Sequence, residues 1–139
     1  MVSDAFRSER APAPVGLYPH ARRAGNLLFL SGVGPRQPGT SEIPGVTLGT
    51  DGRVVDYDIA LQARATFDNV RIILEDAGSA WDRLVDVTVY LTNMAADFAD
   101  YNRIWAEYFA VNPPARTTVE IGALPTPIAI ELKCIATID

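Results

Sequence analysis

The sequence contains a single histidine, His20, and a single cysteine, Cys134, among its 139 residues. Zinc deaminases need several histidine or cysteine ligands, so that mechanism is excluded at the level of ligands. A Ser-His-Asp arrangement could use only His20, which has no partner by spacing. Cys134 cannot form an internal disulfide, and its place in the apolar phase of a predicted strand favours a small buried residue over a nucleophile. No metal and no organic cofactor is therefore expected.

Positive charge, long apolar runs and a glycine-rich phosphate loop are also scarce or missing. The net charge is -5, with 12 Lys and Arg against 17 Asp and Glu. No basic stripe exists to release phosphate counterions, which argues against nucleic-acid binding. The apolar runs are too short to span a membrane, and polar residues 1–10 lack the apolar region of a signal peptide. We expect a cytoplasmic protein without nucleic-acid or membrane partners.

The apolar content, 48% of the residues, is sufficient for one core, so we expect a single domain over residues 1–139. Residues 1–13 mix charges with Ala-Pro repeats and show no periodicity, which indicates a loose N-terminal arm. Residues 33–56 form a long insertion rich in Gly, Pro, Ser and Thr. A loop of that length is usually either disordered or functional. Two interpretations of it stay open: a solvated excursion, or a lid that reads substrate through Arg36.

Apolar periodicity predicts the order strand, strand, long loop, helix, strand, helix, strand, strand. The first helix begins at Asp56 or Asp58 and ends at Gly78; the second begins near residues 95–97, and its aromatic stripe is typical of core. The unbroken apolar run Leu27–Leu30 predicts a strand buried on both faces. The class is therefore α+β, a mixed β-sheet with both helices packed on one face. The open face of the sheet then needs cover from other subunits.

The most chemically distinctive residues follow the double proline Pro113-Pro114, which forces an extended backbone and opens a strand at Arg116. Glu131 falls in the polar phase of the next predicted strand, residues 128–138. A guanidinium and a carboxylate are thus expected on two neighbouring strands. On spacing alone, a structural ion pair of Arg116 with Glu131 or Glu120 competes with a functional site.

The run Pro-Pro-Ala-Arg-Thr-Thr-Val-Glu, followed by Leu-Pro and by Ile-Glu-Leu-Lys-Cys-Ile-Ala, resembles the motif of the Rid (YjgF-like) enamine/imine deaminases. Ser31-Gly32 and segments 62–64, 68–70 and 77–78 also match, so the resemblance covers the chain from about Pro14 onward. The 2-aminomuconate deaminases look closest, because of the insertion and the Ile-Glu-Leu-Lys ending. The resemblance implies a chorismate-mutase-like fold and a homotrimeric barrel with sites in the clefts between subunits.

The resemblance also implies roles for particular residues. Arg116 stands at the arginine that binds the substrate carboxylate, and Glu131 at the glutamate that activates water, roles that suit a bidentate guanidinium and a proton-accepting carboxylate. Thr118 stands where many members carry a cysteine, which leaves thiol chemistry in doubt. The less specific pocket positions are Tyr18, Ser31, Gly32 and Asn102, and the candidates for a distal carboxylate are Arg36 and, behind it, His20 or Arg22.

The leading hypothesis is cofactor-free hydrolysis of the dicarboxylate 2-aminomuconate to 4-oxalocrotonate and ammonia during the breakdown of aromatic compounds. A net charge of -5 repels such a substrate, so local cations such as Arg36 have to offset the field. One alternative is a general Rid deaminase that clears reactive 2-imino acids. The other is a non-catalytic trimer that binds a small carboxylate as a regulator. His20 is either a surface residue of the first hairpin or a pocket contact.

Overall fold

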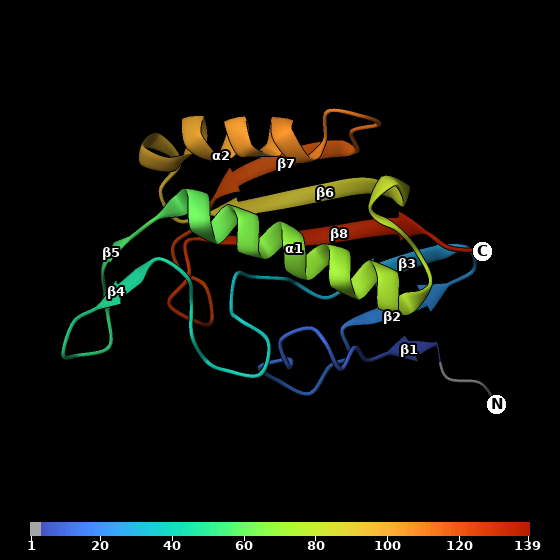
Figure 1. Cartoon of the computed structure of the whole chain (residues 1–139), viewed down its shortest axis with the longest axis horizontal. Coiled ribbons are helices and arrows are strands. Elements are labelled where there is room, and N and C mark those ends of the chain that lie inside the picture. Colours follow the sequence, from blue (N-terminus) through green and yellow to red (C-terminus); the bar gives the residue numbers. More distant parts are fainter. Residues whose placement is uncertain (1–3) are drawn as a thin grey trace.

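The computed structural model describes residues 4–139, which form a six-stranded mixed sheet, two α-helices and a separate two-stranded hairpin (Figure 1). The sheet has the spatial order β1-β2-β3-β8-β6-β7. Its strands are β1 (Ala5–Phe6), β2 (Ala21–Ala24), β3 (Leu27–Leu30), β6 (Leu84–Leu91), β7 (Ala115–Glu120) and β8 (Ile130–Thr137). The hairpin consists of β4 (Val46–Leu48) and β5 (Val54–Tyr57), and a short 3-10 turn, η1, covers Trp81–Arg83. The predicted α+β class is confirmed.

The helices α1 (Ile59–Ala77) and α2 (Met94–Tyr108) begin at capping side chains. Asp58 accepts a hydrogen bond from the backbone N–H of Leu61, which satisfies a free donor of the first turn of α1. Gly78 ends α1 with φ 90°, a left-handed conformation that glycine adopts without steric cost. Asn93 caps α2 by accepting from Ala96 N–H, so α2 begins slightly earlier than its sequence pattern indicates. The predicted limits of α1 are confirmed.

The core lies between the sheet and one layer of helices. Figure 1 shows α1 crossing in front of the central strands, and the side chains of Val87, Val89, Leu132 and Cys134 beneath the helices are fully buried. The stripe on α2 is core as predicted, because Tyr101, Trp105 and Phe109 are buried. Trp105 and Phe109 pack against Phe67 of α1, and Tyr101 packs against Trp105. Burial also raises the pKa of the Cys134 thiol to about 12, which makes a nucleophilic role untenable at neutral pH.

Within residues 4–139, no helix covers the opposite face of the sheet. Leu28 and Leu30 of β3 are buried under the helices, whereas Leu27 and Phe29 are only half-buried. Phe29 lies opposite Ile135 of β8, which is half-buried on the same face. The prediction that β3 is buried on both faces is therefore wrong for one chain, because its second face has no covering layer.

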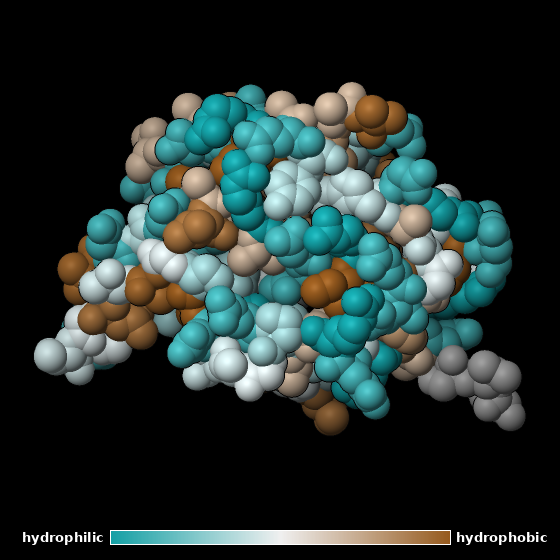
Figure 2. Space-filling view, viewed as in Figure 1, coloured by the Kyte–Doolittle hydropathy of each residue, from teal (hydrophilic) through white to brown (hydrophobic). Residues whose placement is uncertain are grey.

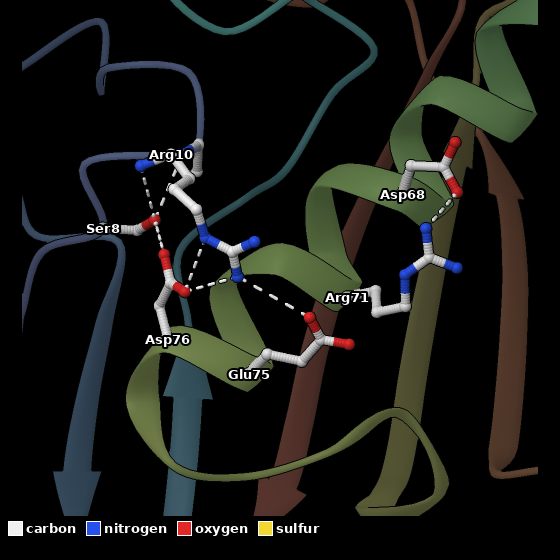
Figure 3. A network of polar contacts seen from close by, with 7 residues as sticks. Ser8, Arg10, Asp68, Arg71, Glu75 and Asp76 are labelled. Carbon is white, nitrogen blue, oxygen red and sulfur yellow. Dashed lines mark hydrogen bonds and ion pairs between the residues drawn. The ribbon is translucent and has the colours of Figure 1, made fainter.

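The expected loose N-terminal arm is instead fixed to the body, except for residues 1–3, which lie outside the described residues. Strand β1 pairs with β2, and the Ser8 hydroxyl donates to Asp76 of α1 at 2.7 Å. Arg10 donates to the same carboxylate at 2.8 Å and approaches Glu75 (Figure 3). These hydrogen bonds, from Arg10 first and Ser8 second, lower the pKa of Asp76. Strand pairing, these polar contacts and the isolated apolar residues Phe6 and Ala11 hold this segment, so apolar periodicity could not reveal it.

The insertion at residues 33–56 is divided into two structural parts. Its first residues follow β3 and stay close to the sheet, because Val33 forms an isolated bridge with Leu132 of β8. Its second part folds into the β4–β5 hairpin, which projects from the body in Figure 1. Leu48, Val54 and Val55 on the hairpin are exposed, and Figure 2 shows a hydrophobic patch at this place. The insertion is thus more ordered than its composition indicates.

Candidate active site

A small cavity lies between the end of β3, the loop before β8 and residues 12–15 of the N-terminal segment. Its volume is about 80 Å³, well below the roughly 300–1,000 Å³ of typical ligand pockets. The cavity that a single chain encloses is therefore smaller than a typical ligand pocket. The cavity brings together six of the residues expected from the sequence: Tyr18, His20, Ser31, Gly32, Arg36 and Glu131.

Glu131 projects from β8 into this cavity, between the buried residues Ile130 and Leu132. Its side chain lies against Gly32, where a Cβ atom would stand 2.8 Å from Glu131 Oε2. Only glycine at position 32 leaves room for the carboxylate in this place. Burial raises the pKa of Glu131. Within residues 4–139, no hydrogen bond or ion pair occupies its carboxylate oxygens. The group is therefore available to a ligand or a water molecule.

The raised pKa of Glu131 makes a prediction about stability. A carboxyl group whose pKa is higher in the folded than in the unfolded state favours folding only when it is protonated, so it opposes folding once the pH rises above its ordinary value of 4.5. Replacing Glu131 with glutamine removes that cost. We expect Glu131→Gln to unfold a few degrees above the wild type at pH 7 and at the same temperature at pH 4, as measured by circular dichroism. If the wild type and Glu131→Gln have the same unfolding temperature at pH 7 as well as at pH 4, the carboxylate of Glu131 is not desolvated in the folded protein.

His20 is buried rather than on the hairpin surface, since only 7% of it is exposed. Its Nδ1 accepts a hydrogen bond from Ser8 N–H at 3.0 Å, and its Nε2 lies 2.7 Å from Pro12 O. An imidazole that accepts at Nδ1 and faces a carbonyl oxygen with Nε2 carries its proton on Nε2. Both ring nitrogens are thus engaged, so His20 holds the segment that forms one wall of the cavity. This geometry does not support its assignment as a donor to substrate.

Two other polar side chains of the cavity lining form hydrogen bonds with backbone atoms of neighbouring residues. Ser31 donates its hydroxyl hydrogen to Pro19 O at 2.7 Å, so the oxygen lone pairs remain free to accept. The Tyr18 hydroxyl accepts from Val15 N–H at 3.3 Å, so its own hydrogen can point toward a ligand. Ser31 and Tyr18 therefore offer an acceptor and a donor respectively to a molecule bound beside Glu131.

Arg36 lines the cavity from the first part of the insertion. Its Nη2 donates to Ala13 O, which leaves other guanidinium hydrogens for a ligand. The position of Arg36 depends on Asn69 of α1, whose amide donates to Gly34 O and Arg36 O, both at 2.9 Å. Sequence reasoning gave Asn69 no role. The available signal was a polar residue on the apolar side of the first helix, where it is buried with 4% exposure.

The remaining expected site residues, Arg116, Asn102 and Thr118, gather at a different place on the chain, where the edge strand β7 meets α2. Arg116 Nη1 donates to Asn102 Oδ1 at 2.9 Å, and its Cζ lies 4.8 Å from the ring centre of Trp105. Phe98 and Tyr101 complete an aromatic surface under the guanidinium, an arrangement that fixes a cation by its attraction to ring faces. Thr118 Oγ1 lies 3.0 Å from Tyr101 Oη.

The expectation that Arg116 and Glu131 lie on neighbouring strands is wrong, because β6 separates β7 from β8. Arg116 is opposite Val87 of β6, which is buried under the helices, whereas Glu131 alternates with buried Ile130 and Leu132 and so points to the other face. The register places Arg116 two strands and three residues away from Glu131, roughly 14 Å between Cα atoms at normal strand spacings. An ion pair between them within one chain is therefore excluded.

The competing pair between Arg116 and Glu120 is also not formed. Glu120 Oε1 accepts instead from Met94 N–H at 2.8 Å, where the negative charge favours the beginning of α2. One chain therefore presents two separate half-sites. The first, around Glu131, has a carboxylate, a serine and a tyrosine. The second, around Arg116, has an oriented cation with its asparagine partner.

Other kinds of site find no support in the described part of the chain. Residues 4–139 contain no group of three or more His, Cys, Asp or Glu side chains placed to hold a metal ion. In the same range, no helix combines the length and the apolar character that a membrane span requires. Neither half-site thus has a set of metal ligands.

Comparison with known proteins gives consistent matches over nearly the whole chain. A family model described as endoribonuclease L-PSP matches residues 8–138. A RutC family protein of Pyrococcus horikoshii is 42% identical over 129 residues, which cover 93% of either protein. The chloroplastic Reactive Intermediate Deaminase A of Arabidopsis thaliana is 37% identical over 131 residues, which are 94% of this chain and 64% of that protein. The crystal structure of the Escherichia coli YjgF gene product superimposes with a TM-score of 0.82 at 35% identity, covering 97% of this chain and 98% of the other.

Proposed function

Because the chain belongs to the Rid/YjgF family, which includes RutC and L-PSP proteins, we propose that it hydrolyses reactive imines or enamines of small carboxylic acids and releases ammonia. The observation that supports this most directly is Glu131, a half-buried carboxylate with no partner in residues 4–139 and a pKa raised by burial. A group of this kind can accept a proton from water and return it. The net charge of -5 opposes an endoribonuclease activity of the kind that the family description names.

The proposed reaction balances with one water molecule and no cofactor. Glu131 accepts a proton from water as the oxygen attacks the carbon of the protonated C=N group, which forms a tetrahedral carbinolamine. The carboxyl group then returns the proton to the nitrogen and the C–N bond breaks. Ammonia leaves as the hydroxyl group gives its proton to the Glu131 carboxylate and the C=O bond forms, and this proton ends on the released ammonia as ammonium. An enamine enters the same sequence after it tautomerises to the imine. Ser31 and Tyr18 are placed to orient the substrate beside Glu131.

The substrate carboxylate requires a cation, and we assign this role to Arg116 of a second copy of the chain. The Glu131 half-site is incomplete in one chain, and Arg116 is oriented by Asn102 and Trp105 and has further guanidinium N–H groups besides the one that donates to Asn102. A guanidinium binds a carboxylate through two parallel hydrogen bonds, which fixes the reacting carbon as well as the charge. The uncovered sheet face and the exposed Leu17, which is 100% exposed near the cavity, favour assembly. A closed homotrimer would give three equivalent sites between subunits.

A narrower proposal is that the substrate is a dicarboxylate such as 2-aminomuconate, which would yield 4-oxalocrotonate. The supporting observation is Arg36, a second cation in the cavity wall with unused guanidinium hydrogens. It would bind the carboxylate far from the nitrogen, while Arg116 binds the near one. A general deaminase of 2-imino acids does not need this second contact.

Arg36→Ala separates these two substrate classes. If Arg36 binds a distal carboxylate, we expect KM for a dicarboxylic enamine to rise about tenfold or more, as for loss of one charge-assisted hydrogen bond. The KM for an imine made from serine should stay within about twofold. Arg53→Ala is the matched control, because Arg53 lies in the same insertion and its side chain is 89% exposed. An unchanged KM for the dicarboxylate would refute the role of Arg36.

The proposed function is tested by ammonia release from 2-aminomuconate generated in situ and from an imine made from serine. We expect turnover of at least one substrate above the uncatalysed rate and loss of turnover in Arg116→Ala. Saturable binding without ammonia release from either substrate would instead favour the regulatory alternative.

A further inference from the structure

Gln62 is a fully buried polar residue in the first turns of α1, with 0% of its surface exposed. Its Oε1 accepts a hydrogen bond from the backbone N–H of Ala129 at 2.8 Å, across 67 residues of sequence. Its Nε2 is buried as well and has no hydrogen-bond partner in residues 4–139. A buried donor without a partner destabilises a fold, and a leucine or methionine would avoid that cost. The presence of an amide at this place therefore needs a reason other than core packing.

Ala129 stands at the junction of two parts of the Glu131 half-site. Before it in the chain, Pro125, Thr126 and Ile128 line the cavity. After it, β8 begins, and Glu131 follows two residues later. The N–H of Ala129 is held by Gln62 from the helix layer, and its carbonyl oxygen accepts from Thr92 N–H at 3.2 Å. Gln62 is the side chain that ties this junction to α1.

We propose that Gln62 is a positioning residue, which fixes the junction of the cavity loop and β8 and thereby keeps Glu131 in its half-buried place in the cavity. The inference rests on the proposed function for its effect on catalysis, but its structural part concerns Glu131 itself. Gln62 touches neither the cavity nor a reacting atom, so it acts only through Ala129. A carboxylate that works as a base loses efficiency when its support moves by even about 1 Å.

The titration of Glu131 reports whether the junction is held. The other titratable groups that line the cavity with it are Tyr18, His20 and Arg36. Tyr90 lies opposite Glu131 on the neighbouring strand β6, and Lys133 follows Glu131 on β8. The pKa of Glu131 is raised by burial, with no contribution from these charges. If the loop at residues 125–128 loosens, the carboxylate becomes more exposed to solvent and its pKa falls toward the ordinary value.

Three variants test the proposal in the full-length protein. Gln62→Leu removes the acceptor for Ala129 N–H, whereas Gln62→Glu retains an acceptor of the same length. Thr66→Val is the control, because Thr66 is also fully buried on α1 but donates only to Gln62 O of its own helix. Carbon-13 NMR follows the titration of Glu131, hydrogen exchange follows the Ala129 amide, and ammonia release gives kcat and KM against pH.

For Gln62→Leu we expect kcat to fall about tenfold or more with a smaller change in KM, and the acid limb of the pH profile and the Glu131 titration to move to lower pH. Ala129 should exchange faster. Gln62→Glu should restore most of kcat, and Thr66→Val should keep the wild-type titration even where it lowers stability. If Gln62→Leu does not fold, Gln62→Asn, whose amide is too short to reach Ala129, decides the same question.

A folded Gln62→Leu or Gln62→Asn protein with the wild-type Glu131 titration and wild-type kcat would overturn the proposal. A loss of activity with an unmoved titration would also overturn it, because that result indicates general destabilisation. If the wild type releases no ammonia from any imine, the proposed function fails by itself. The NMR titration and the exchange of Ala129 then still decide whether Gln62 positions Glu131.

Discussion

Replacing Glu131 with glutamine is expected to lower kcat for imine hydrolysis by about 10²–10⁴-fold, the range that a positioned general base contributes. The amide has nearly the same shape as the carboxyl group and keeps an acceptor oxygen, so the cavity beside Gly32 should keep its form. It cannot take a proton from water. KM should therefore change much less than kcat, because binding of the substrate carboxylate is assigned to Arg116 and not to Glu131.

The matched control for this experiment is Glu120→Gln. Glu120 lies on β7, two strands away from β8 in the same sheet, and its Oε1 accepts from Met94 N–H, a bond that an amide oxygen can still make. We expect this variant to keep kcat within about twofold of the wild type. Ammonia release at saturating substrate measures both variants. A Glu131→Gln enzyme with at least a third of wild-type kcat would refute the assignment of Glu131 as the base.

Arg116→Ala is expected to reduce kcat/KM by about 10²-fold or more, since removal of one partner from a desolvated charge pair costs about 2–5 kcal/mol. Arg116→Lys should recover only part of the loss, because an ammonium cannot make two parallel hydrogen bonds to a carboxylate. Arg103→Ala is the control, as Arg103 lies on α2 beside Asn102 but pairs only with Asp100 and Glu107 on the same helix. Equal losses in Arg116→Ala and Arg103→Ala would contradict a specific role.

The two inactive variants together test whether each site is shared between chains. In a homotrimer assembled at random from equal amounts of Glu131→Gln and Arg116→Ala chains, about a quarter of the sites combine an intact Glu131 with an intact Arg116. Co-refolding should therefore restore about a quarter of wild-type activity from two inactive preparations. Mixed trimers that stay inactive would show that Arg116 and Glu131 do not meet across a subunit boundary.

The parts of the fold that the sequence predicts are those that local chemistry decides. Asp58 and Gly78 mark the ends of α1, because a capping carboxylate and a left-handed glycine act within a few residues of themselves. The alternation of β8 correctly separates Glu131 from its buried neighbours. Cys134 is buried, as its phase indicates. These features depend on short sequence separations.

The errors concern contacts between distant segments. Period-2 alternation shows that Arg116 and Glu131 each have a polar side, but it contains no information on which strand lies between them. Strand β8 lies between β3 and β6, so β7 and β8, which follow one another in sequence, are not neighbours in the sheet. The fixing of residues 5–10 by β2 and Asp76 joins positions up to 68 residues apart, which no local pattern reports.

The same limit explains why Gln62 and Asn69 received no role. Each is a buried amide on the mainly apolar buried side of α1, and each bonds to backbone atoms of a loop rather than to another side chain. A hydrogen bond to a backbone atom does not depend on the residue type of the partner, so the partner cannot be recognised in the sequence. A buried amide inside an amphipathic pattern is therefore a useful indication that a loop is tied to the helix at that level.

The aromatic surface beneath Arg116 has a thermodynamic consequence for ligand capture. A free arginine side chain samples many rotamers, and their loss opposes binding by up to about 2 kcal/mol. Here Trp105, Tyr101 and Asn102 already restrict the guanidinium before any anion arrives. Most of the rotamer entropy of Arg116 is lost when the chain folds, so less is lost on binding. Under its proposed role, Arg116 would therefore bind a small carboxylate at a lower concentration than a mobile arginine would.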